Sequence, residues 1–109
     1  MDDTQRAQLQ QLVSKSKVVL FMKGTKNFPQ CGFSGTVIQI LVKVGVPFET
    51  VNILADADVR QGMKEFSDWP TFPQLYIDAQ FVGGADIVRD MYSNGELQKL
   101  LGQTTETAS

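Results

Sequence analysis

The pattern of apolar and polar positions along the first part of this chain predicts a helix followed by a strand. Residues 4–14 carry a sparse helical repeat of leucine and valine, which indicates a weakly amphipathic helix with Thr4 as its candidate N-cap. The run VVLFM at residues 18–22 is short and continuously apolar, as in a strand buried on both faces of a parallel sheet. A polar loop at residues 24–30 follows it.

The next stretch predicts a helix and then a second strand. Residues 33–44 have an apolar face at helical spacing, and Gly45 with Pro47 is expected to end that helix. Residues 48–52 have the pattern of a strand. Strand, helix and strand in this order form a βαβ unit, which is expected to be parallel and right-handed.

The second half of the chain predicts a helix, a hairpin and a final helical region. Asp56 is suited to cap a helix in which apolar residues recur at i, i+4 and i+7. Residues 75–77 and 80–82 flank a two-residue turn and predict an antiparallel hairpin. Residues 86–101 are expected to be helical, with a break at Asn94-Gly95.

This order of elements predicts an α/β fold, a four-stranded mixed sheet with helices on both faces. The length of 109 residues fits a single domain over residues 1–109 with one core. Residues 103–109 are polar and are expected to form a disordered tail.

Composition narrows the possible functions. The net charge of −2 gives no overall field that would attract nucleic acid or an anionic membrane surface. No apolar run approaches the roughly 20 residues of a membrane-spanning helix. The single cysteine excludes an internal disulfide framework and favours a reducing compartment. The chain has no histidine, which excludes Cys-His and Ser-His-Asp catalysis and the usual zinc sites.

The only cysteine, Cys31, lies in the stretch FPQCGFSGT, between the polar loop and the second predicted helix. A helix N-terminus stabilises a thiolate, and Lys23 and Lys26 precede Cys31 in sequence. Ser34 fills the second place of a C-x-x-C spacing, so no internal thiol can resolve a disulfide. The alternative is that Cys31 is a small buried apolar residue, although core cysteines seldom need a strand-to-helix turn.

Three motifs in order, CGFS at residues 31–34, WPTFP at 69–73 and GGAD at 83–86, resemble the monothiol glutaredoxins of the thioredoxin-fold superfamily. The resemblance covers about residues 17–101 and implies a thioredoxin-like (glutaredoxin) fold. The stretches FMKGT, PFETVNIL and VRQG are most similar to plastid and cyanobacterial members. This similarity implies the plastid stroma as the compartment of the mature chain, with the bacterial cytoplasm as the alternative.

The resemblance also implies a glutathione site beside Cys31, and the chemistry of the residues agrees with it. A cis Phe72–Pro73 bond would turn the Phe72 backbone toward the thiol, where it can pair with the cysteinyl part of the peptide. Cationic side chains would bind the glycine carboxylate, and a helix N-terminus after two glycines would receive the γ-glutamyl end. The expected glutathione-binding residues are Lys23, Arg60, Phe72, Pro73, Ala85 and Asp86.

Each of these residues also has an ordinary structural explanation. Lys23 and Arg60 could be solvated surface charges, Pro73 could simply open a strand, and Asp86 could be a plain N-cap. Phe33 could cap the site sterically or pack into the core. Members of the family that this chain resembles commonly have a cysteine where this chain has Ala85. Glutathione binding should survive this change if the position contributes only its backbone N–H.

Two functions remain open for the single thiol. The first is iron–sulfur carriage: a [2Fe–2S] cluster needs four thiolates, which the resemblance implies come from the Cys31 residues of a homodimer and two glutathiones. The apo chain would then be a monomer, and its partners would be iron–sulfur apoproteins and BolA-type regulators. The second is protein deglutathionylation, in which Cys31 takes glutathione from a mixed disulfide and a second glutathione resolves it. The resemblance implies weak oxidoreductase activity at most.

Overall fold

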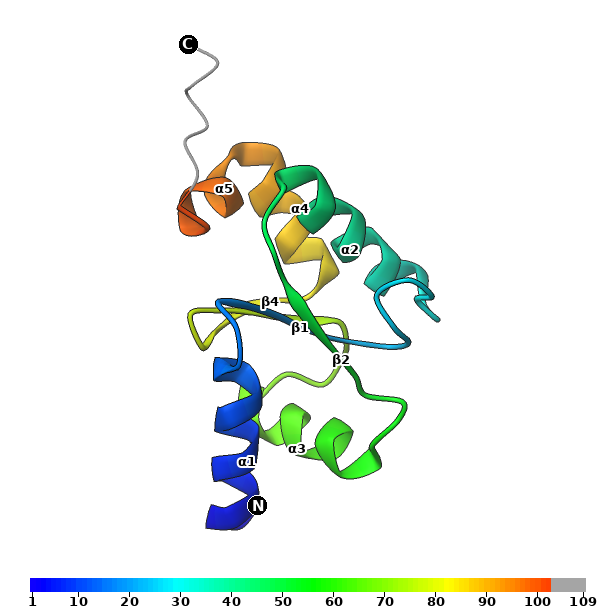
Figure 1. The fold of residues 1–109 in the computed structure, drawn as a ribbon, viewed down its shortest axis with the longest axis vertical. Helices are drawn as coiled ribbons and strands as arrows, with labels where there is room; N and C mark the ends of the chain where they lie inside the picture. Colours follow the sequence, from blue (N-terminus) through cyan, green and yellow to red (C-terminus); the bar gives the residue numbers. More distant parts are fainter. Residues whose placement is uncertain (103–109) are drawn as a thin grey trace.

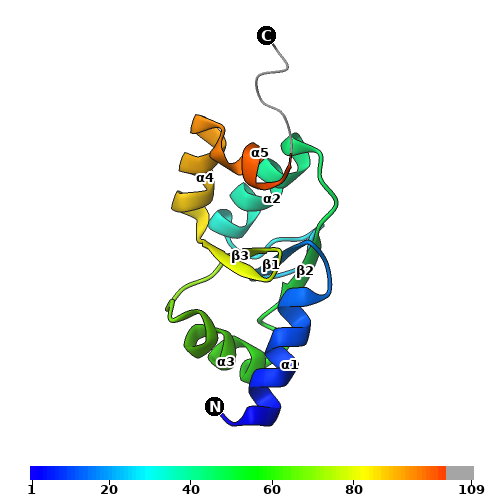
Figure 2. The same ribbon diagram turned by 90° about the vertical axis from the view of Figure 1, so that its left-hand side faces the viewer.

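The computed structural model describes residues 1–102, in which a central sheet lies between two layers of helices (Figures 1 and 2). Helices α1 and α3 cover one face, and α2, α4 and α5 cover the other. This confirms the predicted mixed α/β architecture. The elements are α1 (Asp3–Ser14), β1 (Val18–Met22), α2 (Gly32–Val44), β2 (Glu49–Asn52), α3 (Ala57–Ser67), β3 (Gln74–Ile77), β4 (Gln80–Gly83), α4 (Ala85–Asn94) and α5 (Glu96–Leu100).

The four strands have the order β2-β1-β3-β4. β1 pairs in parallel with β2 and antiparallel with β3, and β3 and β4 form an antiparallel hairpin. Both the βαβ unit and the hairpin are therefore confirmed. The hairpin turn lacks glycine, and Asp78 and Ala79 themselves adopt positive φ values of 51° and 64°, the conformation that two-residue hairpin turns require.

β1 divides the core into two parts. All five of its residues are buried. Val18, Leu20 and Met22 pack toward α2, α4 and α5, whereas Val19 and Phe21 pack toward α1 and α3. This alternation is the period-2 pattern of a strand, with an apolar layer on each face. The sheet is thus packed between two layers of helices, and the loops that leave it are attached to strands with buried side chains.

Most helix boundaries agree with the sequence patterns, and the exceptions have local causes. α1 begins at Asp3 because the Asp2 carboxylate accepts a hydrogen bond from the Gln5 N–H at 2.7 Å, so Thr4 is not the cap. Asp56 caps α3, as predicted, by accepting from two backbone N–H groups. α4 and α5 are separated at Gly95, as predicted, where φ is 85°. The tail expected at residues 103–109 lies outside the described residues.

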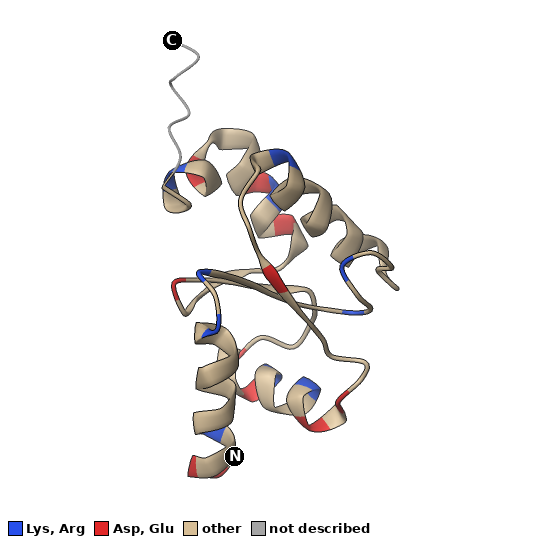
Figure 3. Cartoon of the chain, viewed as in Figure 1, with Lys and Arg blue, Asp and Glu red and all other residues tan. Residues whose placement is uncertain are grey.

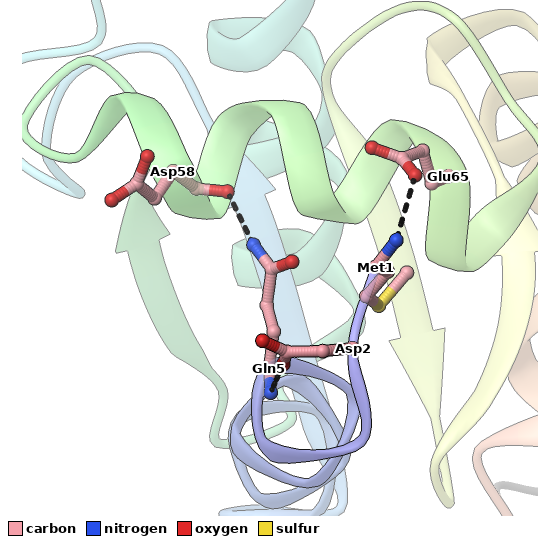
Figure 4. Close-up of polar contacts among 5 residues, drawn as sticks. All are labelled: Met1, Asp2, Gln5, Asp58 and Glu65. Atoms are coloured by element: carbon pink, nitrogen blue, oxygen red, sulfur yellow. Dashed lines mark hydrogen bonds and ion pairs between the residues drawn. The ribbon is translucent and has the colours of Figure 1, made fainter.

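α1 packs closely against α3, the helix that carries Arg60 (Figure 4). The Gln5 side-chain amide donates to the Asp58 C=O at 3.4 Å, and the ammonium of Met1 lies 3.7 Å from the Glu65 carboxylate. Gly62 faces Leu9 so closely that an added Cβ would lie 3.0 Å from the leucine side chain. These contacts hold α3 at a fixed distance from the first helix.

Charged residues are spread over both helical layers and the loops, with the two signs mixed (Figure 3). Among the strands that the structure describes within residues 1–102, the only charged position is Glu49 of β2. No helix within residues 1–102 is long and apolar enough to cross a membrane.

Candidate functional site

Cys31 is the N-cap of α2, and its thiol is partly exposed. The preceding loop is held by hydrogen bonds at both ends: the Gln30 N–H donates to the Lys23 C=O at 2.9 Å, and the Gly24 N–H donates to Asn52 Oδ1 at 3.0 Å. Gly24 has φ 97°, and a Cβ there would lie 2.6 Å from the Gln30 nitrogen, so only glycine fits this turn. The loop therefore delivers the thiol to a helix N-terminus.

The surroundings of Cys31 favour its thiolate and lower the pKa of the thiol. The largest cause is a hydrogen bond from the Ser34 backbone N–H, which lowers the pKa. Partial burial raises the pKa, whereas the Phe33 N–H, the charge of Lys23 and the Ser34 hydroxyl lower it further. Lys26, also expected to act on the thiolate, instead donates to the Phe48 C=O at 2.8 Å, with its ammonium 4.2 Å from the ring centroid. Cys31 is partly exposed, so it is not the small buried core residue of the alternative interpretation.

Ser34 has a second role in this arrangement. Its side chain is fully buried, and its hydroxyl oxygen accepts a hydrogen bond from the Lys23 N–H at 3.2 Å. The hydroxyl proton is then free to point to the Cys31 sulfur. Ser34 thereby joins the end of β1 to the first turn of α2.

The thiol lies on a cavity of about 310 Å³, at the small end of the range for small-molecule sites. Its walls come from the residue that follows β1, the start of α2, the loop that connects α3 to β3, and the start of α4. Six residues expected from the sequence line it: Lys23, Cys31, Phe72, Pro73, Ala85 and Asp86. Arg60 is exposed on α3 and is not among the lining residues.

Phe72 is one of the residues that line the cavity. Its side chain is buried with the core residues of α1 and α3. The Phe72–Pro73 bond is cis. Among residues 1–102, no hydrogen bond engages the Phe72 N–H or C=O. Both groups are therefore available to an extended ligand.

The start of α4 forms the opposite wall. Gly84 is the N-cap and offers no side chain to the first helical N–H groups, which leaves them available to an anion. Asp86 is therefore not the N-cap, and its exposed carboxylate lies 3.1 Å from Arg89. A Cβ on Gly84 would lie 3.4 Å from the Pro73 C=O, so this glycine lets α4 approach the loop.

Several lining residues received no role from the sequence, namely Trp69, Thr71, Gly84 and Ile87. Trp69 and Thr71 belong to the WPTFP motif, so the motif could have indicated that they lie near the site. Their position on the cavity wall depends on the path of the loop, which the motif does not specify. Phe33 also lines the cavity, and its exposed fraction of 62% decides that it forms the rim and does not pack into the core.

Comparison with known proteins gives consistent matches. Residues 18–82 match the family model described as Glutaredoxin. The uncharacterized monothiol glutaredoxin ycf64-like of Synechocystis sp. is 56% identical, over 93% of this chain and 94% of the relative. The chloroplastic monothiol glutaredoxin-S7 of Oryza sativa subsp. japonica is 64% identical, over 88% of this chain but only 57% of the relative.

A solved structure gives the same result for the fold. The solution structure of reduced poplar apo GrxS14 superimposes with a TM-score of 0.79. It is 59% identical and covers 89% of both chains.

Proposed function

From the premise that this chain belongs to the glutaredoxin family, among its monothiol members, we propose that it binds glutathione beside Cys31 and carries a [2Fe–2S] cluster between two copies of the chain. The observation that carries the proposal is the thiol of Cys31 opening onto a cavity with unpaired backbone donors and one lysine. The cavity matches a small peptide with two carboxylates, one ammonium and one thiol.

The glutathione would lie across the cavity with its thiol beside Cys31. The ammonium of Lys23 would bind the glycine carboxylate, and the free N–H and C=O of Phe72 would pair with the cysteinyl backbone. The first N–H groups of α4 would bind the γ-glutamyl carboxylate, with Asp86 facing its ammonium. Arg60 would bind the same glycine carboxylate, for which its side chain would have to extend from α3 toward the cavity.

The cluster would be a transferred group and not a permanent part of the protein, because one chain supplies only one of its four sulfur ligands. A [2Fe–2S] cluster needs four thiolates, and one chain offers a single cysteine. Across residues 1–102, no three His, Cys, Asp or Glu side chains are grouped so as to hold a metal ion. Two copies and two glutathiones complete the set. The lowered pKa of Cys31 supports this use, since the thiolate is the metal ligand.

The same thiolate favours a second candidate function, glutathione-dependent thiol exchange. The Cys31 thiolate would attack the glutathione sulfur of a mixed disulfide and release the protein thiol. A second glutathione would then attack the Cys31 disulfide, forming glutathione disulfide and regenerating the thiolate. The partly exposed thiol and its lowered pKa support this reaction, and it requires no second cysteine.

Anaerobic reconstitution with iron, sulfide and glutathione tests the first function. We expect the visible absorption of a [2Fe–2S] centre in a species of dimeric size, and neither in Cys31→Ser. A cluster that forms equally well without glutathione would refute the mechanism. Turnover in a deglutathionylation assay that equals that of a dithiol glutaredoxin would favour the enzyme instead.

Partners and compartment follow from the same proposal. Iron–sulfur apoproteins would receive the cluster, and a BolA-type protein could share it in a heterodimer. The relatives include chloroplastic and cyanobacterial proteins. We therefore propose the plastid stroma or the bacterial cytoplasm as the compartment.

A further inference from the structure

Gln74, the first residue of β3, is a polar side chain in a fully buried position. Its side-chain amide donates to the Trp69 C=O at 3.1 Å and to the Thr71 C=O at 3.2 Å. Both carbonyls belong to the loop that forms one wall of the cavity. The amide therefore ties the strand to this loop at two points.

The loop has few other restraints. The Trp69 N–H donates to the Lys64 C=O and to the Ser67 hydroxyl, which anchors the loop where it leaves α3. Beyond Trp69, no backbone–backbone hydrogen bond in the described part of the chain engages the stretch 70–72. The two hydrogen bonds from Gln74 are thus the polar contacts that fix this stretch before the sheet begins.

We propose that Gln74 is a positioning residue for glutathione: its amide holds the Trp69 and Thr71 carbonyls inward and thereby leaves the Phe72 N–H and C=O free to pair with the peptide. This inference rests on the proposed glutathione site. Gln74 lies outside the cavity lining, so it acts through the loop and does not touch the ligand.

The remaining oxygen of the same amide supports a functional role over a structural one. Gln74 Oε1 is buried and has no hydrogen-bond partner among residues 1–102. An unpaired buried carbonyl oxygen costs stability. An apolar side chain of the same size would avoid this cost, and the loop carbonyls of the exposed residues Trp69 and Thr71 could turn to water. Gln74 is therefore a poor choice for stability alone.

The test compares Gln74→Met, which keeps the side-chain length without any donor, with Gln80→Met on the exposed position of β4. Reduced glutathione is titrated under anaerobic conditions while the emission of Trp69 is recorded. Trp69 is the only tryptophan of the chain and lines the cavity. We expect the Kd of Gln74→Met to rise about tenfold, as loss of one to two hydrogen bonds predicts. The emission maximum of the ligand-free variant should also shift.

Two further measurements separate positioning from general damage. The rate of Cys31 alkylation by iodoacetamide should be unchanged in Gln74→Met, because the thiol is held by α2 and Ser34. The melting temperature should change by less than about 8 °C. Gln80→Met should match the unaltered chain in all measurements.

The outcomes distinguish the two proposals. Failure of the unaltered chain to bind glutathione would overturn the proposed function and this inference with it. Normal binding by the unaltered chain and an equal Kd in Gln74→Met would overturn only the role of Gln74. A weaker Kd accompanied by slower alkylation, or by a melting temperature lowered by more than about 8 °C, would also overturn it, because either result would indicate a structural role.

Discussion

The substitution Ser34→Ala separates the two roles of the serine at the start of α2. It removes the hydroxyl that contributes to lowering the pKa of Cys31 and that accepts from the Lys23 N–H at 3.2 Å. It keeps the Ser34 backbone N–H, which is the largest stabilising contact of the thiolate. Thr36→Ala is the matched control, because its hydroxyl donates to the Gly32 C=O in the same helix and does not touch the thiol.

The cost in stability follows from burial. The hydroxyl of Ser34 is fully buried, so its removal leaves the Lys23 N–H without its partner. A buried donor left unpaired costs about 1–3 kcal/mol. The Thr36 hydroxyl bonds to a helix carbonyl in an exposed setting, so the control should lose about 0.5 kcal/mol or less. Urea denaturation measures both values.

The effect on the thiol has a defined sign. The contacts in the folded state hold the pKa of Cys31 below its ordinary value of 9.0. That stabilisation of the fold is complete above pH 9.0 and is lost as the pH falls through the folded-state pKa. Ser34→Ala raises the folded-state pKa toward the ordinary value. Its stability deficit should therefore widen as the pH rises toward 9.0.

Alkylation by iodoacetamide as a function of pH reports the thiolate directly. At neutral pH Ser34→Ala should react more slowly than the unaltered chain, and the two rates should converge once both thiols are ionised. Thr36→Ala should follow the unaltered curve. An alkylation profile of Ser34→Ala that is unshifted or shifted to lower pH would refute the assigned role of the hydroxyl.

Three further substitutions test the remaining parts of the site and fold. Lys23→Gln should raise the pKa of Cys31 and weaken glutathione binding. Because Lys23 acts on the thiolate through its charge, added salt should reduce the difference in pKa between the variant and the unaltered chain. A difference that does not change with salt would contradict this role. Asp86→Asn should weaken binding of glutathione but not of an analogue that lacks the γ-glutamyl amine, and equal losses for both ligands in calorimetry would reject the assigned contact. Asp56→Ala should destabilise the domain by about 0.5–2 kcal/mol through loss of the α3 cap, with alkylation of Cys31 unchanged.

The sequence predicted the sheet well because its signals are local. A five-residue apolar run can be buried on both faces only in a central strand, and β1 is that strand. The cap of α1 was assigned wrongly because Asp2 and Thr4 are both good capping residues. The choice between them depends on which oxygen reaches an unpaired N–H, and that is a property of the folded backbone.

The motifs predicted six of the residues that line one cavity, but they did not predict the contacts that support this cavity. Cys31 and the glycines before α4 have local signatures at a helix start. Lys26 was expected near the thiol from its position in the chain, yet its ammonium is held by Phe48, a residue beyond the following helix. Gln74 likewise has no local signature, because its role depends on carbonyls of a loop whose path the sequence does not specify.

Each chain offers one thiolate and one cavity, so retention of a cluster would depend on how much glutathione is present in solution. Under the proposed function, half of the four sulfur ligands belong to dissociable molecules, whose occupancy follows their concentration and their Kd. Every contact that sets this Kd then also sets how firmly the cluster is held. Ser34 contributes to this outcome by leaving no internal thiol at the C-x-x-C spacing that could displace glutathione. Under the proposed function, the missing second cysteine would thus allow an external thiol to control both loading and release of the cluster.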